Sequence, residues 1–122
     1  MASTKIFIGE DDVIIQMFLS RILTHAGFEI VGDGRDSESI LEGLAECEPD
    51  LILLDIGLEG EVDGVDTAAI IKERYEGLPF ISLTGNSDEG TMVRARKTEP
   101  TGFIFKPIDE TQLIEEVSKL KS

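Results

Sequence analysis

The stretch PDLILLD, residues 49–55, decides the fold predicted for this chain. Its core is a run of four apolar residues, Leu51 to Leu54, and the run ends abruptly at the carboxylate of Asp55. A short, continuous apolar run is typical of a parallel strand that is covered on both faces of its sheet. We therefore expect a strand near the middle of a parallel sheet, with Asp55 at its carboxyl end.

Short β-rich runs and segments of helical spacing alternate along the rest of the chain. The expected strands span about residues 5–9, 28–32, 50–54, 79–83 and 102–105. The expected helices span about residues 12–26, 37–47, 65–75, 89–97 and 110–120. Such alternation indicates βα units, because the helices supply the long crossovers that parallel strands need. The sequence predicts an α/β protein with a single domain, residues 1–122.

Length and composition limit the class of protein. A chain of 122 residues with 41% hydrophobic residues is long enough to bury one core and too apolar to be disordered. No apolar run approaches the roughly 20 residues that span a bilayer, and the start MASTKIFIG lacks the apolar core of a secretory signal. The one cysteine, Cys47, can form no internal disulfide, which fits a reducing compartment. We expect a soluble, cytoplasmic protein that does not associate with membranes.

The net charge of −14 arises from 25 acidic and 11 basic residues. Such a field repels nucleic acid and attracts cations, so direct binding to DNA or RNA is not expected. Basic residues gather at MVRARK, where Arg94, Arg96 and Lys97 lie close together. They form either a solvated helix face or a patch that docks a partner on an otherwise acidic protein.

Polar side chains follow most of the expected strands. Open α/β sheets bind their ligands beyond the carboxyl ends of the strands, so these residues are candidates for a site. The groups are Glu10 and Asp11 after the first strand, Asp55 after the third, Thr84 after the fourth and Lys106 after the fifth. This edge of the sheet therefore collects acids, one hydroxyl group and one lysine.

The acids that follow neighbouring strands should lie close together, since adjacent strands are only ~4.8 Å apart. Like charges at that distance need compensation, and Mg²⁺, which prefers oxygen ligands, supplies it. A cation, the ammonium group of Lys106 and the hydroxyl group of Thr84 are together the usual equipment for holding a phosphoryl group. The nucleophile is then expected to be Asp55, because an aspartyl carboxylate can form an acyl phosphate.

Four segments, IFIGEDD, DLILLD, ISLTG and GFIFKP, resemble in order and spacing those of the response-regulator receiver domains of two-component signalling. The resemblance extends to DGVDTAAI and TEPTGFIFKP, and it covers essentially the whole chain. Receivers of this chemotaxis-receiver-like family have a flavodoxin-like (βα)5 fold, a doubly wound parallel sheet with strand order 2-1-3-4-5. The resemblance implies the same fold and strand order here.

The resemblance also implies roles for individual residues. Asp55 would accept a phosphoryl group from the phosphohistidine of a sensor kinase or a histidine phosphotransfer protein. Asp11 and Asp55 would bind Mg²⁺ directly. Glu10 would act through a metal-bound water, and the backbone carbonyl group of Gly57 would complete the protein ligands. The chain would then be a phosphoacceptor that slowly loses its own phosphoryl group, and not a conventional enzyme.

Further roles concern the conformational switch. Thr84 and Lys106 would contact the phosphoryl oxygens, and the Lys106–Pro107 peptide bond would be cis. Thr84 would move toward the phosphate and the ring of Phe103 would reposition with it, which would change a protein-binding surface. Core packing explains Phe103 equally well. Because 122 residues leave no room for an output domain, the output would be a binding event, unless the chain is a receiver taken from a larger protein.

Some positions depart from the usual pattern of the family. The loop IGLEGEVDG is one residue longer than usual before Gly64, and Glu59 stands where proline is common. Gly57 and Asn86 occupy the two positions that family members vary to tune the lifetime of the phosphoryl group. Phe103 replaces the commoner tyrosine, so its ring can rotate but offers no hydroxyl group. The conformation of the loop and the phosphoryl lifetime are therefore open.

The first expected helix has an apolar band that is wider than one sheet face needs. Val13, Ile14, Met17 and Phe18 lie beside the residues expected to face the core. Either a neighbouring loop buries them, or they form a surface for a partner or for a homodimer.

Two other functions use similar residues. A phosphatase of the haloacid dehalogenase type also combines an Asp, a Thr or Ser, a Lys and Mg²⁺, but its nucleophile resembles a DxD pair that closes the first strand. Here Asp55 closes the third strand, and Gly57 stands two residues after it. A receiver fold that binds partners without phosphorylation would be favoured if an acid, Thr84 or Lys106 were missing.

Overall fold

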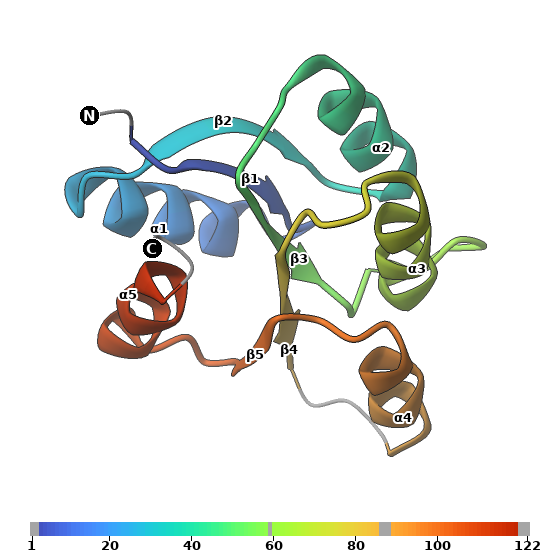
Figure 1. The fold of residues 1–122 in the computed structure, drawn as a ribbon. Coiled ribbons are helices and arrows are strands. Elements are labelled where there is room, and N and C mark those ends of the chain that lie inside the picture. The colour runs from blue at the N-terminus through green and yellow to red at the C-terminus, as the bar shows by residue number, and fades with distance from the viewer. Residues whose placement is uncertain (1–2, 59, 86–88, 120–122) are drawn as a thin grey trace.

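The computed structural model describes residues 3–58, 60–85 and 89–119. Five strands and five helices alternate along the chain, as Figure 1 shows. The strands are β1 (Lys5–Gly9), β2 (Glu29–Gly34), β3 (Leu51–Asp55), β4 (Phe80–Thr84) and β5 (Gly102–Phe105). The helices are α1 (Val13–His25), α2 (Ser37–Glu46), α3 (Gly64–Arg74), α4 (Glu89–Lys97) and α5 (Glu110–Ser118).

The five strands form one parallel sheet in the order β2-β1-β3-β4-β5, which confirms the predicted fold and strand order. All five residues of β3 are buried. The strand pairs with β1 through Leu53 and Ile8, and with β4 through Leu53 and Ile81. The apolar run quoted above is therefore the central strand, and its continuous hydrophobicity follows from burial on both faces.

The helices cover both faces of the sheet (Figure 1). The helices α1 and α5 share one core with the sheet, which includes Leu19, Leu23, Leu53 and Leu113. The helices α2 and α3 share the other, which includes Phe7, Ile40 and Ile71 among its buried side chains. Alternate residues of each strand feed the two cores, because successive strand side chains point to opposite faces.

Aspartate residues mark the beginning of most helices. The side chains that accept hydrogen bonds from the first turn of α1, α2, α3 and α5 belong to Asp12, Asp36, Asp63 and Asp109. An aspartate at this position satisfies backbone N–H groups that have no partner within the helix. At the other ends, Gly27 follows α1 and Gly77 follows α3 with positive φ angles of 98° and 86°, which glycine adopts without strain.

The boundaries differ from the predicted ones by a few residues. The strand β2 ends at Gly34 instead of residue 32, and α5 is described only as far as Ser118. Leu120, the last residue of the range expected for that helix, lies outside the described residues. Among the described residues, no helix has the length and apolar character needed to span a membrane.

Candidate functional site

The carboxylate of Asp55 lies at the carboxyl end of the central strand. The residue is only 3% exposed, and its Oδ1 accepts a hydrogen bond of 2.8 Å from the backbone N–H of Gly57. The backbone N–H of Ile56 continues the sheet by donating to the carbonyl oxygen of Leu83 at 3.0 Å. Burial of the strand and these two backbone contacts fix the position of the carboxylate.

Two more carboxylates come from the chain that follows β1. Glu10 is fully buried, its backbone N–H donates to the carbonyl oxygen of Gly34 at 3.0 Å, and Asp11 is exposed. Carboxylate oxygens of Glu10, Asp11 and Asp55 all lie within 4.8 Å of one another. Strands β1 and β3 are neighbours in the sheet, so their carboxyl ends place these acids side by side.

Lys106 reaches the same place from the end of β5. Its Nζ lies 2.8 Å from Glu10 Oε1 and 3.3 Å from Asp55 Oδ2. The backbone N–H of Lys106 donates to the carbonyl oxygen of Thr84 at 2.7 Å, which anchors the start of the segment to β4. Asp109, which follows nearby in the sequence, accepts from the N–H of Gln112 at the start of α5. The structure therefore brings together four of the residues that the sequence singled out: Glu10, Asp11, Asp55 and Lys106.

The charges at this site do not cancel. Burial of Glu10, together with the nearby carboxylate of Asp55, raises the pKa of Glu10 to about 7. Burial alone would lower the pKa of Lys106, but its ion pairs with Glu10 and Asp55 raise it above the ordinary value. Apart from the ion pair to Lys106, Oε1 of Glu10 has no hydrogen bond within the described part of the chain. Closely spaced oxygen ligands with excess negative charge fit a divalent cation such as Mg²⁺.

Thr84 ends β4 and is fully buried. Its hydroxyl oxygen lies 3.5 Å from the carbonyl oxygen of Gly85 and 3.6 Å from the sulfur of Met92 on α4. Sequence reasoning did not identify Met92, because only the packing of α4 over the end of β4 brings its sulfur to Thr84. A contact of Thr84 with phosphate stays a prediction.

Phe103 lies on β5 and is half-buried. Its ring stacks on that of Phe105 with centroids 6.4 Å apart, and it packs against a small cluster of Ile56, Val65 and Ala95. Both predicted roles, core packing and movement with Thr84, are compatible with this half-buried position. The Lys106–Pro107 peptide bond is cis, as the resemblance implied.

The loop between Asp55 and α3 returns closely to the strand that it leaves. The backbone N–H of Gly64 donates to the carbonyl oxygen of Leu58 at 3.1 Å. The metal-binding role expected for the carbonyl group of Gly57 stays a prediction. Glu59 and Asn86, the two other positions where the family pattern is varied, lie outside the described residues.

The three basic residues of α4, Arg94, Arg96 and Lys97, differ in their contacts. Arg94 forms ion pairs with Asp63 and Asp66 at the beginning of α3, whereas Arg96 and Lys97 are exposed. The sequence interpretation treated the three residues alike and missed the contacts of Arg94. The aspartates at the start of α3 could have suggested a basic partner, but not which residue supplies it.

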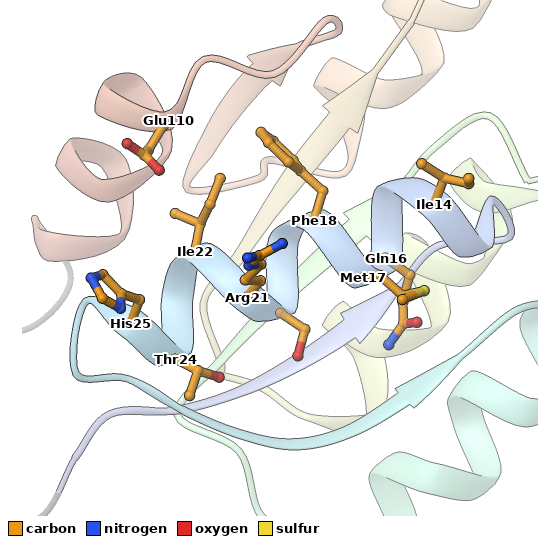
Figure 2. Close-up of a pocket in the computed structure, with 10 residues that line it drawn as sticks. Ile14, Gln16, Met17, Phe18, Arg21, Ile22, Thr24, His25 and Glu110 are labelled. Carbon is orange, nitrogen blue, oxygen red and sulfur yellow. The ribbon is translucent and has the colours of Figure 1, made fainter.

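The outer face of α1 is exposed. Ile14 is 77% exposed and Met17 62%, and Val13 and Phe18 are exposed by nearly half. Of the two alternatives that the sequence left open, burial under a neighbouring loop is therefore wrong. Figure 2 shows the face, with Ile14 near the start of the helix, His25 near its end, and Glu110 of α5 across a shallow hollow that these helices line.

Known sequences resemble this chain over most of its length. It is 32% identical over 114 residues to the transcriptional regulatory protein DegU of Brevibacillus brevis, which covers 93% of this chain and 48% of DegU. It is 33% identical to the transcriptional regulatory protein PdtaR of Mycobacterium tuberculosis, covering 90% of this chain and 53% of PdtaR. The chain thus spans about half the length of these two relatives. It is also 25% identical to the chemotaxis protein CheY of Thermotoga maritima, over 95% of this chain and 96% of CheY.

Solved structures share the fold. The signal receiver domain of a modulated diguanylate cyclase from Desulfovibrio desulfuricans G20 superimposes with a TM-score of 0.90 at 28% identity, covering 98% of this chain and 94% of that one. A CheY-like receiver domain protein from Methanospirillum hungatei has a TM-score of 0.89 at 23% identity, covering 98% and 95%, and shows likeness of fold alone. The family model for the response regulator receiver domain matches residues 6–118, so this chain belongs to the response regulator receiver domains.

Proposed function

We propose that the chain accepts a phosphoryl group from a phosphohistidine onto Asp55, with Mg²⁺ as cofactor, and that the acyl phosphate switches a protein-binding surface. The observation that supports this most directly is the position of Asp55. Its buried carboxylate lies among Glu10, Asp11 and Lys106, with the Lys106 ammonium nitrogen 3.3 Å away. In the transfer, a carboxylate oxygen of Asp55 bonds to phosphorus while the phosphorus–nitrogen bond breaks, and its electron pair leaves with the imidazole.

The carboxylates, Lys106 and Thr84 would have different roles in the transfer of the phosphoryl group. Glu10, Asp11 and Asp55 would hold Mg²⁺, which when bound neutralises charge on the phosphoryl oxygens. Lys106 carries its positive charge on the same side of Asp55 and stabilises the charge of the product. Thr84, at the end of the adjacent strand, supplies a hydroxyl donor. On this proposal the chain is itself the phosphoacceptor, with Asp55 taking the place of a separate substrate, and not a conventional enzyme.

The donor is a phosphohistidine-bearing protein, a sensor kinase or a histidine phosphotransfer protein, and it docks on α1. The helix begins two residues after Asp11, so a partner seated on its exposed face lies next to Asp55. Residues 13–25 contain no acidic side chain, although the chain as a whole has 25 acidic residues. Apolar contacts with Ile14 and Met17 are therefore available without repulsion from this part of the surface.

The output is a binding event between this domain and another protein, or another domain, in the cytoplasm. A net charge of −14 disfavours direct contact with nucleic acid. Relatives such as DegU are transcriptional regulators about twice as long as the region that they share with this chain. If such regulators contact DNA, we expect the contact to lie in the half of their sequence that this chain does not share.

Phosphorylation by acetyl phosphate, followed by intact mass spectrometry, tests the proposal. We expect the wild-type chain to gain one phosphoryl group in Mg²⁺ and to gain none in excess chelator. The Asp55→Asn variant removes the nucleophile at nearly constant shape and should gain none under either condition. Failure of the wild type to gain mass, or equal gain by the variant, would contradict the assignment. Sustained hydrolysis of a phosphate monoester would point to a phosphatase instead.

A further inference from the structure

Arg94 connects α4 to the beginning of α3, away from the residues that surround Asp55. We propose that Arg94 is a positioning residue, which holds the backbone of Asp55 in place through Asp63 and Gly64 and so couples the position of α4 to phosphoryl transfer. This inference rests on the proposed function of Asp55. Three contacts in series support it: an ion-pair network, a helix cap and a close backbone approach.

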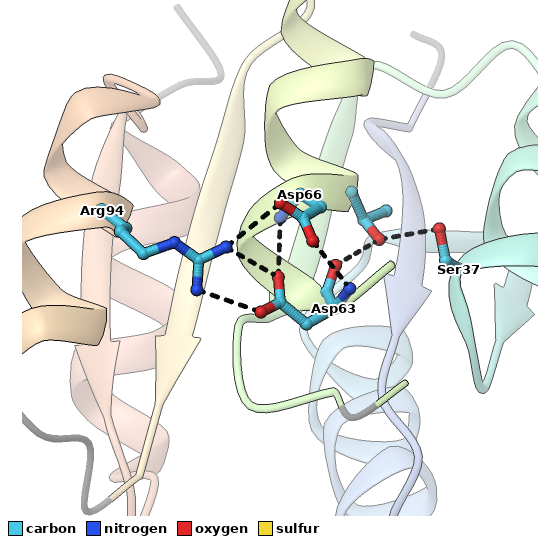
Figure 3. Close-up of polar contacts among 5 residues, drawn as sticks. Ser37, Asp63, Asp66 and Arg94 are labelled. Carbon is cyan, nitrogen blue, oxygen red and sulfur yellow. Dashed lines mark hydrogen bonds and ion pairs between the residues drawn. The ribbon is translucent and has the colours of Figure 1, made fainter. Parts of the chain in front are cut away.

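The first contact is the fork of Arg94 on two carboxylates. Its Nη1 lies 3.1 Å from Asp63 Oδ2, and its Nη2 lies 3.3 Å from Asp63 Oδ1 and 3.1 Å from Asp66 Oδ1. Figure 3 shows the guanidinium group reaching from α4 to both aspartates. Two parallel bonds from one guanidinium group to one carboxylate fix direction as well as distance.

The second contact ties those carboxylates to backbone. Asp63 Oδ1 accepts from the N–H of Asp66 at 2.9 Å, and Asp66 Oδ2 accepts from the N–H of Asp63 at 3.2 Å. This reciprocal pair is a capping box at the beginning of α3. Burial would raise the pKa of Asp63, but the backbone N–H of Asp66 and the charge of Arg94 together lower it below the ordinary value. Arg94 is therefore fixed to the backbone of α3 and not to freely moving side chains.

The third contact joins the beginning of α3 to the phosphoacceptor. Gly64 follows Asp63, and a Cβ atom built on it would lie 2.5 Å from the carbonyl oxygen of Asp55 and 2.5 Å from the backbone of Ile56. Backbone therefore packs directly on backbone at this point, with no side chain between to absorb movement. Because packed interiors transmit strain, a displacement of Asp63 reaches Asp55.

The helix α4 depends on these polar contacts for its position. Of its described side chains only Ala95 is buried, so hydrophobic burial holds it weakly. A second ion pair between the same regions, Lys72 to Glu99 at 2.7 Å, lies at the far end of α3 from Gly64. Met92 of α4 contacts Thr84, so a shift of the helix acts on both sides of the site. Of the two ion pairs, only the one made by Arg94 leads to Asp55.

The main experiment measures the initial rate of phosphorylation by acetyl phosphate in saturating Mg²⁺. Arg94→Gln should slow the rate about three- to tenfold, because small displacements of reacting groups cost rate steeply. Arg94→Lys keeps the positive charge but cannot form the two parallel hydrogen bonds to Asp63, so its rate should lie between those of the wild type and Arg94→Gln. Two matched controls should stay close to the wild-type rate: Arg96→Gln, on the same helix, and Lys72→Gln, which breaks the other ion pair. The melting temperature should fall equally little in Arg94→Gln and Lys72→Gln, since exposed ion pairs stabilise weakly.

A second measurement does not depend on phosphorylation. Amide hydrogen exchange at Ile56 and Gly57 should be several-fold faster in Arg94→Gln and unchanged in Lys72→Gln. A wild-type rate in Arg94→Gln, or slowing equal to that of Lys72→Gln, overturns the inference and leaves the proposed function intact. Absence of phosphorylation in the wild-type chain overturns the proposed function and, with it, the catalytic part of the inference. Unchanged exchange in Arg94→Gln overturns the structural part.

Discussion

Three carboxylates and one ammonium group meet at the carboxyl end of the sheet, and Glu10 is the most deeply placed of them. Glu10 is fully buried, whereas Asp11 is exposed. Ionisation of Glu10 therefore costs more free energy than ionisation of Asp11, because its carboxylate has no contact with water. The raised pKa of Glu10, about 7, is the expression of that cost in the metal-free protein. Binding of a proton to Glu10, or of a cation beside it, would remove the unfavourable energy of this buried negative charge.

This predicts an unusual dependence of stability on pH in excess chelator. The pKa of Glu10 rises from 4.5 to about 7 on folding, so its contribution to stability is complete below pH 4.5 and is lost as the pH rises through 7. Relative to Glu10→Gln, a neutral residue of similar shape, the free energy of unfolding of the wild type should fall by about 2 to 3 kcal/mol between pH 5 and pH 8. Urea unfolding of both proteins between pH 5 and pH 8 measures this change in the free energy of unfolding. A difference between the two that does not change with pH would contradict the assigned pKa.

The sequence predicts a residue of the site correctly where its position at the end of a strand determines its position in the fold. Asp55 ends a strand, Glu10 and Lys106 each follow one, and parallel strands bring their carboxyl ends to one edge. The contacts of Arg94 and Met92 could not be predicted, because each depends on how α4 packs on the remainder of the molecule. Sequence spacing says nothing about that packing, since the two partners of each contact belong to different elements.

Among the elements, α1 has apolar residues on both its buried side and its exposed side. Its inner side packs Leu19 and Leu23 into the core, and its outer side exposes Ile14 and Met17 to solvent. Residues that are exposed and apolar add nothing to folding and carry a risk of aggregation. Their presence next to the end of β1, on a helix without acidic residues, is what supports docking of the phosphodonor on this face.

A negative charge introduced on the docking face should separate two kinds of phosphorylation. Met17→Glu should slow transfer from a phosphorylated histidine kinase that is active on the wild type by at least about tenfold, since burying an unpaired carboxylate in an interface costs more than about 1.4 kcal/mol. The rate with acetyl phosphate should not change, because Asp55 is untouched. Val93→Glu introduces the same charge at an exposed apolar position of α4 and serves as the control. Equal slowing with both donors would indicate damage to the site instead of lost docking.

The elements themselves were largely predictable, and the reasons are local. The central strand β3 is fully apolar up to Asp55, and aspartates begin four of the helices. The exposure of the outer face of α1 was left open by the sequence, because an amphipathic pattern that is too wide has two explanations. Only the arrangement of the neighbouring segments, which leave Ile14 and Met17 uncovered, decides between them.

For the molecule as a whole, a net charge of −14 acts against the compact state. Folding concentrates the acidic residues, and their mutual repulsion destabilises the folded protein relative to the extended chain. The carboxyl edge of the sheet adds a local cluster to this general field. Dissolved salt screens the general field, whereas a bound cation would compensate, at short range, the negative charge of the cluster that Lys106 leaves unbalanced.

Sodium and magnesium chloride at equal ionic strength should therefore stabilise the protein to different extents. Both should raise the melting temperature by screening, but MgCl₂ should raise it further, since a ligand at 100 times its Kd adds about 2.7 kcal/mol to the free energy of unfolding. The additional effect should be absent in Asp11→Asn, which removes one exposed carboxylate of the cluster and leaves the buried pair of Glu10 and Asp55 in place. Asp33→Asn lowers the charge equally at an exposed position of β2 and should retain the effect of Mg²⁺. Identical melting temperatures in the two salts would show that screening alone stabilises this protein. A magnesium effect that survives in Asp11→Asn would show that the cation binds at a place other than the cluster.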